Sequence, residues 1–322
     1  MQGKVPPEQS APRVYVGVDV CKDWLDVYLH PIGHQFRIAS TPDGLKRLKR
    51  HLAGLQVVVI VMEATAKYHR QPHRTLSAAG FAVAVVNPLR SRLFAEATGQ
   101  LAKTDRLDAR VLAILAESLE PAATPPVAEA LAALQELVRA RAAAIADQTA
   151  LTNQRAASQT AFLKAELGRR LKAIATHIAR LEAEIDRRIA SDPALKRRYE
   201  IVRSIPGIGP VAAVALIIGL PELGTCSGKA AGLLAGLAPL ACDSGATAGQ
   251  RRIRGGRAHV RTALYFAAIA AARFNPGLSG FYRRLRAAGK KPKVAITAVM
   301  RKLVVLANVL IREDRLWQAH QA

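Results

Sequence analysis

Four carboxylates lie at places in this sequence where they could take part in metal-dependent chemistry: Asp19, Glu63, Asp105 and Asp108. Asp19 and Glu63 each end a short, uninterrupted run of mostly β-branched residues, which is the pattern of a buried strand. A charge at the end of a buried strand is costly unless it has a partner. Asp105 and Asp108 lie three residues apart at the start of a helical pattern, so they share one helix face. Several carboxylates without an evident neutralising side chain suit a hard divalent cation such as Mg²⁺.

Such a set has a chemical use, but each member also has a simpler explanation. Two divalent cations about 3.5–4 Å apart can activate a nucleophile and stabilise the leaving oxygen of a phosphodiester. Taken singly, Asp105 could be a carboxylate that stabilises a helix N-terminus. Asp19 and Glu63 could be turn residues at strand ends. The four together, each at the edge of a predicted element, favour the metal site.

The chain as a whole is strongly basic, with a net charge of +23, and the excess is concentrated toward the C-terminus. After Gly245 there are 16 Lys and Arg residues against two acids, Glu313 and Asp314. A mixed or acidic surface would serve solubility equally well. A one-sided basic segment therefore indicates nucleic-acid binding, and a metal site in such a chain is expected to act on a polyanion.

Two kinds of segment could hold a nucleic-acid backbone. In Ser204–Pro210, Gly207 and Gly209 separate two helical patterns, as in a helix-hairpin-helix element whose backbone N–H groups approach a phosphate. A plain interhelical turn is the alternative there, and a solvated helix face is the alternative for the basic side chains. The cations predicted to contact phosphates are Lys103, Arg251, Arg252, Arg254, Arg257, Lys290 and Lys291.

A serine precedes these arginines in the glycine-rich stretch Asp243-Ser244-Gly245. Facing several guanidinium groups, Ser244 could be a nucleophile. Asp-Ser-Gly is also ordinary turn chemistry, and from these residues alone the turn is favoured. Cys242 is a rival nucleophile, although nothing nearby indicates an activated thiol.

The elements that must position these residues follow from the hydrophobic pattern. Three successive strands precede alternating helices and strands, which is the order of an α/β domain of the ribonuclease-H type. We assign this metal-binding domain to residues 13–118. The expected strands are Val14–Asp19, Trp24–His30, Gln35–Ala39, Val57–Met62 and Phe81–Val86, and the expected helices are Pro42–Leu52, Lys67–Ala79, Leu89–Thr98 and Asp105–Ser118.

A breaker-rich linker, Glu120–Pro126, separates this domain from a long helical pattern over residues 128–192. Leu and Ile recur at steps of three or four from Leu163 to Ile189, which is a heptad-like seam. The seam predicts either a coiled coil between copies of the chain or an intramolecular helical hairpin. Residues 201–322 are expected to form a mainly helical domain that carries the basic surface.

Cysteine usage and hydropathy constrain the location of the protein. Cys21, Cys226 and Cys242 are odd in number and lack C-x-x-C spacing, so neither a disulfide framework nor a zinc site is expected. The first dozen residues lack the apolar core of a signal peptide. No uninterrupted apolar run approaches the roughly 18–20 residues of a membrane span. We therefore expect a cytoplasmic, nucleoid-associated protein with no membrane partner.

Taken together, these motifs resemble one family, the DEDD transposases of bacterial insertion sequences (the IS110 family). The string Lys-Thr-Asp-x-x-Asp-Ala and the order in which the motifs follow one another are the specific part, and the resemblance extends from about residue 14 to residue 311. The matching segments of its RuvC-like N-terminal half are Val16–Asp19, Met62–Tyr68, Asn87-Pro88 and Lys103–Arg110. Those of its C-terminal half are Ser204–Pro210, Ala235–Pro239, Asp243–Gly245 and Ala263–Tyr265.

This resemblance implies a RuvC-like domain, a coiled-coil connector that holds subunits together, and a mainly α transposase domain. It implies Mg²⁺ at the four carboxylates, and it makes Ser244 the nucleophile that forms a transient phosphoserine link to DNA, in place of the turn residue favoured above. The metal site would complete a composite active centre with another subunit of a dimer or tetramer. A structured non-coding guide RNA would pair with donor and target DNA and supply most of the specificity.

Two positions depart from the family pattern, and two other functions stay open. Ala66 replaces a glycine that usually follows Ala-Thr, and the usual Ser-Gly-x-Ser stretch reads Ser244-Gly-Ala-Thr247. The adjoining basic segment is also shorter. One alternative function is a RuvC-like, metal-dependent Holliday-junction endonuclease, which uses water and does not need Ser244. The other is a nucleic-acid-binding protein that has lost its chemistry.

Overall fold

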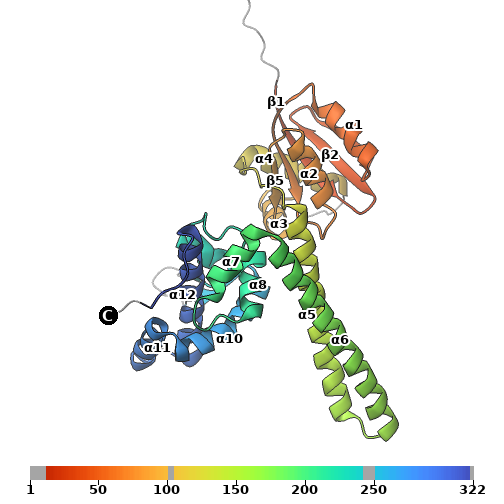
Figure 1. The fold of residues 1–322 in the computed structure, drawn as a ribbon. Helices are drawn as coiled ribbons and strands as arrows, with labels where there is room; N and C mark the ends of the chain where they lie inside the picture. The colour runs from red at the N-terminus through yellow and green to blue at the C-terminus, as the bar shows by residue number, and fades with distance from the viewer. Residues whose placement is uncertain (1–11, 101–104, 242–250, 320–322) are drawn as a thin grey trace, which may run out of the picture. The chain divides into compact units, whose positions relative to one another are not determined.

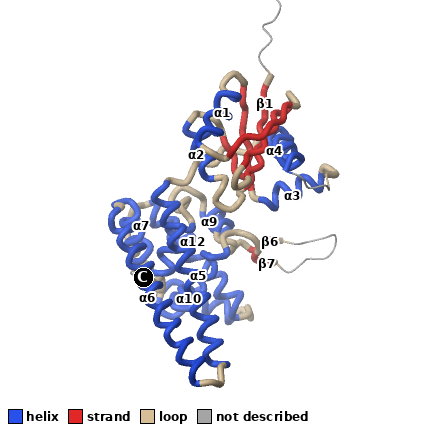
Figure 2. The backbone as a smooth tube through the Cα atoms, turned by 90° about the vertical axis from the view of Figure 1, so that its right-hand side faces the viewer, coloured by secondary structure: helices blue, strands red, loops and turns tan. Residues whose placement is uncertain are grey.

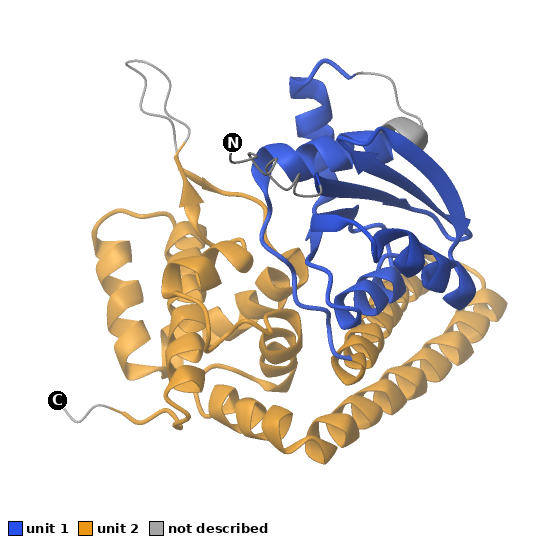
Figure 3. Cartoon of the chain, turned by 90° about the horizontal axis from the view of Figure 1, so that it is seen from above, with its two compact units in different colours: residues 1–128 blue, residues 129–322 orange. Residues whose placement is uncertain are grey.

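The structure is a computed structural model that describes residues 12–100, 105–241 and 251–319, with the backbone alone for residues 105–107. The chain divides into two compact units, residues 1–128 and residues 129–322 (Figure 3). Each unit has hydrophobic cores of its own. Each can therefore be understood as a domain that positions its own functional residues.

A five-stranded mixed sheet is the frame of the first unit (Figure 1). Its strands lie in the order β3-β2-β1-β4-β5, and this order confirms the predicted α/β class with a helical region after it. The first three strands form an antiparallel meander, and β4 and β5 run parallel to β1. The bounds are β1 Arg13–Val20, β2 Trp24–His30, β3 His34–Ala39, β4 Gln56–Glu63 and β5 Val83–Val86.

Helices cover both faces of this sheet, because side chains of a strand alternate between the two faces. On one face, valines of β1 pack against leucines of α1 (Pro42–Leu52) and α2 (Arg70–Ala78). On the other face, Tyr15 and Val61 pack against α4 (Asp105–Leu119). The odd-numbered residues of β1 therefore lie on the face that α4 covers.

The predicted bounds are least accurate between β4 and α2. We expected a helix from Lys67, but α2 begins at Arg70, because a turn precedes it in which Ala66 has a φ of +42°. A residue with a Cβ is strained in this left-handed region, which glycine enters freely. Ala66 is the position at which the family pattern has glycine. The left-handed backbone of this turn explains why glycine suits the position.

Ala66→Gly is expected to stabilise the first unit by about 0.5–1 kcal/mol, because relief of the left-handed strain exceeds the entropy that a glycine adds to the unfolded chain. Urea unfolding of wild type and variant measures the difference. Ala79→Gly is the matched control, since Ala79 has a φ of −85° and should lose stability on the same change. A urea concentration at half-unfolding for Ala66→Gly that is at or below that of wild type would contradict backbone strain at Ala66.

Two long helices open the second unit, α5 (Glu129–Ala157) and α6 (Ala161–Ser191). They lie side by side as an intramolecular hairpin (Figure 1). Within the predicted seam, Leu167, Ile178 and Ile185 are buried, whereas Leu163 at the tip is exposed. The hairpin therefore uses much of the seam, and a coiled coil between copies of the chain stays a prediction.

The rest of the second unit is a helical domain around one core, to which Leu134 and Ile185 of the hairpin also belong. A short antiparallel pair of strands, β6 and β7, projects from it (Figure 2). The bounds are α7 Pro193–Arg203, α8 Pro210–Gly219, α9 Gly228–Leu234, β6 Pro239–Leu240, β7 Arg252–Ile253, α10 Ala258–Phe274, α11 Pro276–Ala287 and α12 Pro292–Arg312.

The last helix, α12, is long and apolar enough to cross a membrane by length and composition alone. Half of its most apolar window is buried inside the protein. Val299, Leu303 and Leu310 are fully buried members of the core of the second unit. This burial accounts for the hydropathy of α12 as that of a core helix.

Candidate active site

Two neighbouring strands bring two of the predicted carboxylates to one edge of the sheet. β1 and β4 are parallel, and Val18 pairs with Met62 in their register. Asp19 and Glu63 are the next residues on the two strands, and both are half-buried. The carboxyl ends of adjacent parallel strands form the edge at which α/β sheets commonly bind ligands. The structure thus places both carboxylates at this edge of the sheet.

Helix α4 carries the other two carboxylates. It lies on the face of the sheet to which the odd-numbered residues of β1 point. A Cβ built on Gly17 of β1 would overlap the backbone of Ala109, so glycine allows the helix to lie directly on the strand. Asp108 precedes Ala109, and it therefore lies close to the strand that carries Asp19. Asp105 begins α4, one turn earlier, and its side chain lies outside the described residues.

The chemistry of this donor set suits a hard divalent cation, whose preferred ligands are carboxylate oxygens. Among the residues that the structure describes, no three His, Cys, Asp or Glu side chains are gathered closely enough to hold a metal ion. The backbones of Asp19, Glu63 and Asp108 are thus brought to one region without their side chains forming a ligand set. The role of these residues as metal ligands stays a prediction.

A further carboxylate, which sequence reasoning did not single out, lies directly opposite Asp19. Asp26 of β2 pairs with Asp19 in the antiparallel ladder, and its side chain is almost fully buried. Arg37 of β3 donates two hydrogen bonds to Asp26, with N–O distances of 2.9 and 2.7 Å. Opposed like charges repel, and this bidentate guanidinium neutralises one of them. In the sequence, Asp26 lies between the apolar residues Leu25 and Val27. A polar residue in such an alternation is expected to face solvent, so the sequence did not indicate that Asp26 is buried.

A serine of the next helix holds Glu63. Asn87 caps α3 (Pro88–Ala97), and Ser91 in its first turns is buried. The Ser91 hydroxyl lies 2.6 Å from Glu63 Oε2 and 3.0 Å from the Pro88 carbonyl oxygen. It has a single proton, and donation to the charged carboxylate is the stronger bond. Ser91 is therefore a positioning residue for Glu63, and only its place after Asn87-Pro88 could have indicated it from the sequence.

The predicted nucleophile, Ser244, lies outside the described residues. Residues 242–250, which contain it, follow β6 and precede β7, and these two strands pair in an antiparallel ladder (Figure 2). Arg251, Arg252 and Arg254 are exposed in and beside β7. Exposed guanidinium groups so close in sequence to the serine are suited to phosphate contacts, which stay a prediction.

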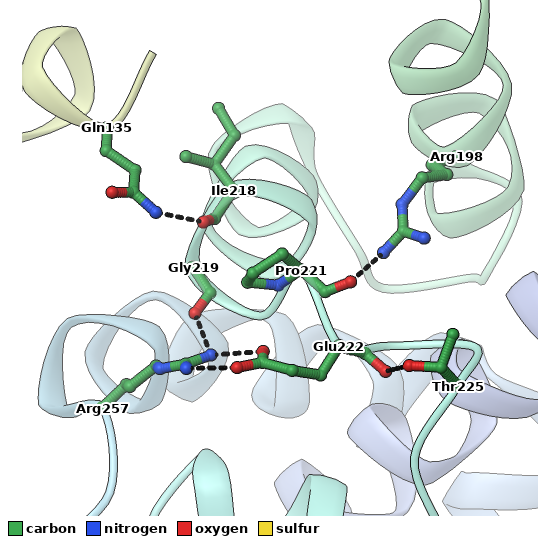
Figure 4. A network of polar contacts seen from close by, with 8 residues as sticks. All are labelled: Gln135, Arg198, Ile218, Gly219, Pro221, Glu222, Thr225 and Arg257. Carbon is green, nitrogen blue, oxygen red and sulfur yellow. Dashed lines mark hydrogen bonds and ion pairs between the residues drawn. The ribbon is translucent and has the colours of Figure 1, made fainter. Parts of the chain in front are cut away.

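Arg257, which we predicted to contact phosphate, has partners inside the protein (Figure 4). Its guanidinium donates to the two carboxylate oxygens of Glu222 at 2.6 and 2.5 Å and to the Gly219 carbonyl oxygen at 2.8 Å. Gly219 is the last residue of α8, so the cation satisfies a carbonyl at a helix C-terminus, where positive charge is favoured. Both terminal nitrogens of Arg257 are thus engaged in holding α8 to the start of α10.

Acid is expected to weaken the contact between Glu222 and Arg257. The direction of this effect on stability follows from the pKa of Glu222. Burial raises that pKa, but the hydrogen bonds and charge of Arg257 outweigh burial, and the pKa is lowered. Stability from Glu222 is therefore complete above the ordinary glutamate pKa of about 4.3 and is lost as the pH falls through the lower folded-state pKa.

Glu222→Gln should consequently lower the free energy of unfolding by about 1 kcal/mol at neutral pH, since the ion pair is partly exposed, and by less in strong acid. Thermal unfolding at the two pH values measures both differences. Glu313→Gln, which breaks the exposed pair with Arg315, is the control and should have little effect. An equal loss of stability for Glu222→Gln at both pH values would contradict a contribution that depends on the ionised form of Glu222.

Packing shapes the glycine hairpin before α8. Gly207 has a φ of +101°, and a Cβ on it would lie 2.6 Å from Ala271 of α10, so this glycine allows close contact between the hairpin and α10. Gly209 has open space where its Cβ would be and is the N-cap residue of α8. Nucleic-acid contacts at both glycines stay predictions. The predicted lysines are exposed where they are described, at Lys290 and Lys291, and lie outside the described residues at Lys103.

Comparison with known families gives matches over most of the chain. A transposase family model of the DEDD type, named for IS110, matches residues 16–158. A second model, of the IS116/IS110/IS902 transposase family, matches residues 199–283. The first match contains most of the sheet and the four predicted carboxylates, and the second contains the glycine hairpin and the segment with Ser244.

Similar proteins carry names that agree with these matches. The pilin gene-inverting protein of Moraxella bovis is 25% identical over 316 residues, which cover 94% of this chain and 97% of that protein. The protein of the same name from Moraxella lacunata gives the same identity and coverage. An uncharacterized 42 kDa protein of insertion element IS900 from Mycobacterium paratuberculosis is 28% identical over 199 residues, or 56% of this chain and 47% of that protein.

Proposed function

The chain belongs to the IS110/IS116/IS902 family of transposases, and from this membership we propose that Ser244 attacks DNA beside a Mg²⁺ site formed by the four carboxylates of the first unit. The enzyme class follows from the family itself: the protein is a DNA recombinase. A DEDD-type transposase depends on a divalent metal, and the choice of Mg²⁺ is ours. The observation that carries the proposal is the placement of Asp19 and Glu63 at adjacent ends of parallel strands, with α4 drawn onto Gly17.

The proposed reaction is a transesterification. The Ser244 oxygen forms a bond to phosphorus, its proton leaves to a base or water, and the phosphorus–oxygen bond to the departing deoxyribose breaks. Rejoining to a new deoxyribose hydroxyl reverses these changes and releases the serine. The number of phosphodiester-type bonds is conserved, so no nucleotide cofactor is needed.

The residues of the chain divide this work between the two units. The carboxylates of the first unit would hold the cation, which when bound supplies charge neutralisation at the reacting phosphate. Ser91 orients Glu63, and the pair of Asp26 with Arg37 limits repulsion beside Asp19. In the second unit, Arg251, Arg252 and Arg254 would hold the DNA backbone close to the serine.

Specificity and assembly belong to the same proposal. We place donor and target DNA, a structured non-coding guide RNA and further copies of this chain in the working complex, as a dimer or tetramer. The relatives named for inverting a pilin gene support a reaction that cuts and rejoins DNA segments. The basic second unit supports binding of polyanions by the same chain.

Strand exchange in a purified system tests the proposed function. The full-length protein is incubated with DNA that contains the element junction, target DNA, Mg²⁺ and RNA transcribed from the flanking sequence. Recombinant joints are expected, and removal of Mg²⁺ by a chelator should abolish them. Cleaved DNA with free ends and no joints would favour the water-using endonuclease instead.

Ser91→Ala is expected to raise the Mg²⁺ concentration for half-maximal strand exchange by about 10-fold, because loss of a group that orients a ligand costs roughly 10- to 100-fold. Titration of the same reaction with Mg²⁺ measures the change. Ser91→Thr keeps the hydroxyl and should restore most of the affinity. Thr98→Ala, which removes a hydroxyl bonded only to the backbone at the end of α3, is the control. An unchanged titration for Ser91→Ala would exclude the positioning role.

A further inference from the structure

The solvent side of α10 carries large hydrophobic side chains. Phe266 is 76% exposed, Phe274 66%, Ile269 43% and Tyr265 36%. The opposite side of the helix packs into the core of the second unit. A helix with no partner beyond its own core usually has polar residues on the solvent side. We call these four residues the α10 aromatic face, and an exposed apolar patch of this kind marks an interaction site.

Two contacts hold the rings of the α10 aromatic face in place. The rings of Tyr265 and Phe266 meet edge to face, with centroids 5.6 Å apart and an interplanar angle of 80°. The guanidinium carbon of Arg273 lies 5.2 Å from the centroid of the Phe274 ring. Rings that are already ordered lose little conformational freedom when a partner binds. The stacked guanidinium also gives the face a positive charge.

The surroundings of the face identify the charge of its partner. Helices α10, α11 and α12 (Figure 1) contain no Asp or Glu, and they carry nine Lys and Arg residues. A second copy of the chain would bring the same positive charge against this face, which disfavours self-association there. A polyanion is attracted instead. An acidic peptide would meet the charge, but it would stack on the rings only where it also carried aromatic side chains, whereas every nucleotide carries a base.

We infer that the α10 aromatic face stacks the bases of unpaired DNA. Every base has a π-face, and aromatic side chains beside cations form the recurrent platform for single strands. In a duplex the bases stack on one another and are closed to such contacts. A recombinase must leave bases unpaired while strands are exchanged. The inference therefore rests on the action of the family on DNA and does not depend on the identity of the nucleophile.

Binding of single and double strands tests the inference. The full-length protein, with a chelator present to stop metal-dependent cleavage, is titrated into labelled oligo(dT), into oligo(U) RNA and into a duplex of equal length at one salt concentration. Adding Phe266→Ala and Phe274→Ala together is expected to weaken oligo(dT) binding by at least about 10-fold. Duplex binding should change by less than about twofold, because it depends on phosphate contacts. Circular dichroism confirms that the variant is folded.

Phe162→Ala is the matched control, since Phe162 is 75% exposed at the tip of the α5–α6 hairpin and should not affect binding. Equal weakening of single-strand and duplex binding, or no weakening, would overturn the inference. So would a dimer in light scattering that the double substitution dissociates, or a loss confined to oligo(U) RNA. Failure of strand exchange in wild type with normal oligo(dT) binding would instead count against the proposed chemistry.

Discussion

Asp19→Asn is expected to reduce the rate of DNA strand exchange by at least about 10³-fold. The substitution keeps the size of the side chain and removes a charge that a divalent cation needs, and charge stabilisation by such a cation is worth several kcal/mol in phosphoryl chemistry. The initial rate of joint formation at saturating Mg²⁺ measures the effect. DNA binding should persist, because all the cations predicted to contact phosphate except Lys103 belong to the second unit.

Glu96→Gln is the matched control for that experiment. Glu96 lies on α3, close in sequence to the carboxylate set, but it is exposed, and its ion pair with Arg92 is loose, with an N–O distance of 3.8 Å. Its replacement should leave strand exchange within about twofold of wild type, as for an ordinary surface residue. Full activity of Asp19→Asn, with Glu96→Gln unchanged, would exclude Asp19 from the metal site.

Ser244→Ala is expected to abolish strand exchange, with a loss of at least about 10³-fold, because removal of a nucleophile leaves only the contribution of binding and electrostatic groups. Supercoiled substrate should remain uncut, since cleavage and covalent attachment are one step in the proposed reaction. Gel separation of cut, joined and intact DNA measures both effects in the same samples.

Cys242→Ala supplies the control for this second substitution, because Cys242 is the rival nucleophile two residues away. It should retain strand exchange. Activity that survives Ser244→Ala and disappears in Asp19→Asn would assign the protein to water-using endonucleases. Activity that disappears in Cys242→Ala and survives Ser244→Ala would transfer the nucleophile to the thiol.

Much of the first unit could be predicted because its local signals agree. The β1 and β4 runs are uninterrupted apolar runs of mostly β-branched residues, as in strands covered on both faces. Helix α1 begins at Pro42 with the side chain of Thr41 accepting from the Gly44 backbone N–H, which is a local cap that sequence rules describe well. Pairing of β1 with β4 then determines which carboxylates become neighbours.

Contacts between distant segments could not be predicted in this way. The seam over α6 fits a hairpin and a coiled coil equally, because heptad spacing specifies a face and not the partner on it. Arg257 looked like the neighbouring arginines, yet Glu222, 35 residues away, engages it. Asp26 and Ser91 are ordinary polar residues in the sequence, and only the packing of β2, β3 and α3 reveals their contacts.

Mass spectrometry of the protein–DNA adduct tests the central claim most directly. Wild-type protein is mixed with junction DNA, target DNA, guide RNA and Mg²⁺, quenched in denaturant, and digested with trypsin and nuclease. A peptide that carries a nucleotide on the Ser244 oxygen is expected, and the same peptide should be unmodified in Asp19→Asn. An adduct on Cys242 or on a tyrosine, or strand exchange that proceeds without any adduct, would contradict a serine nucleophile supported by the carboxylate site.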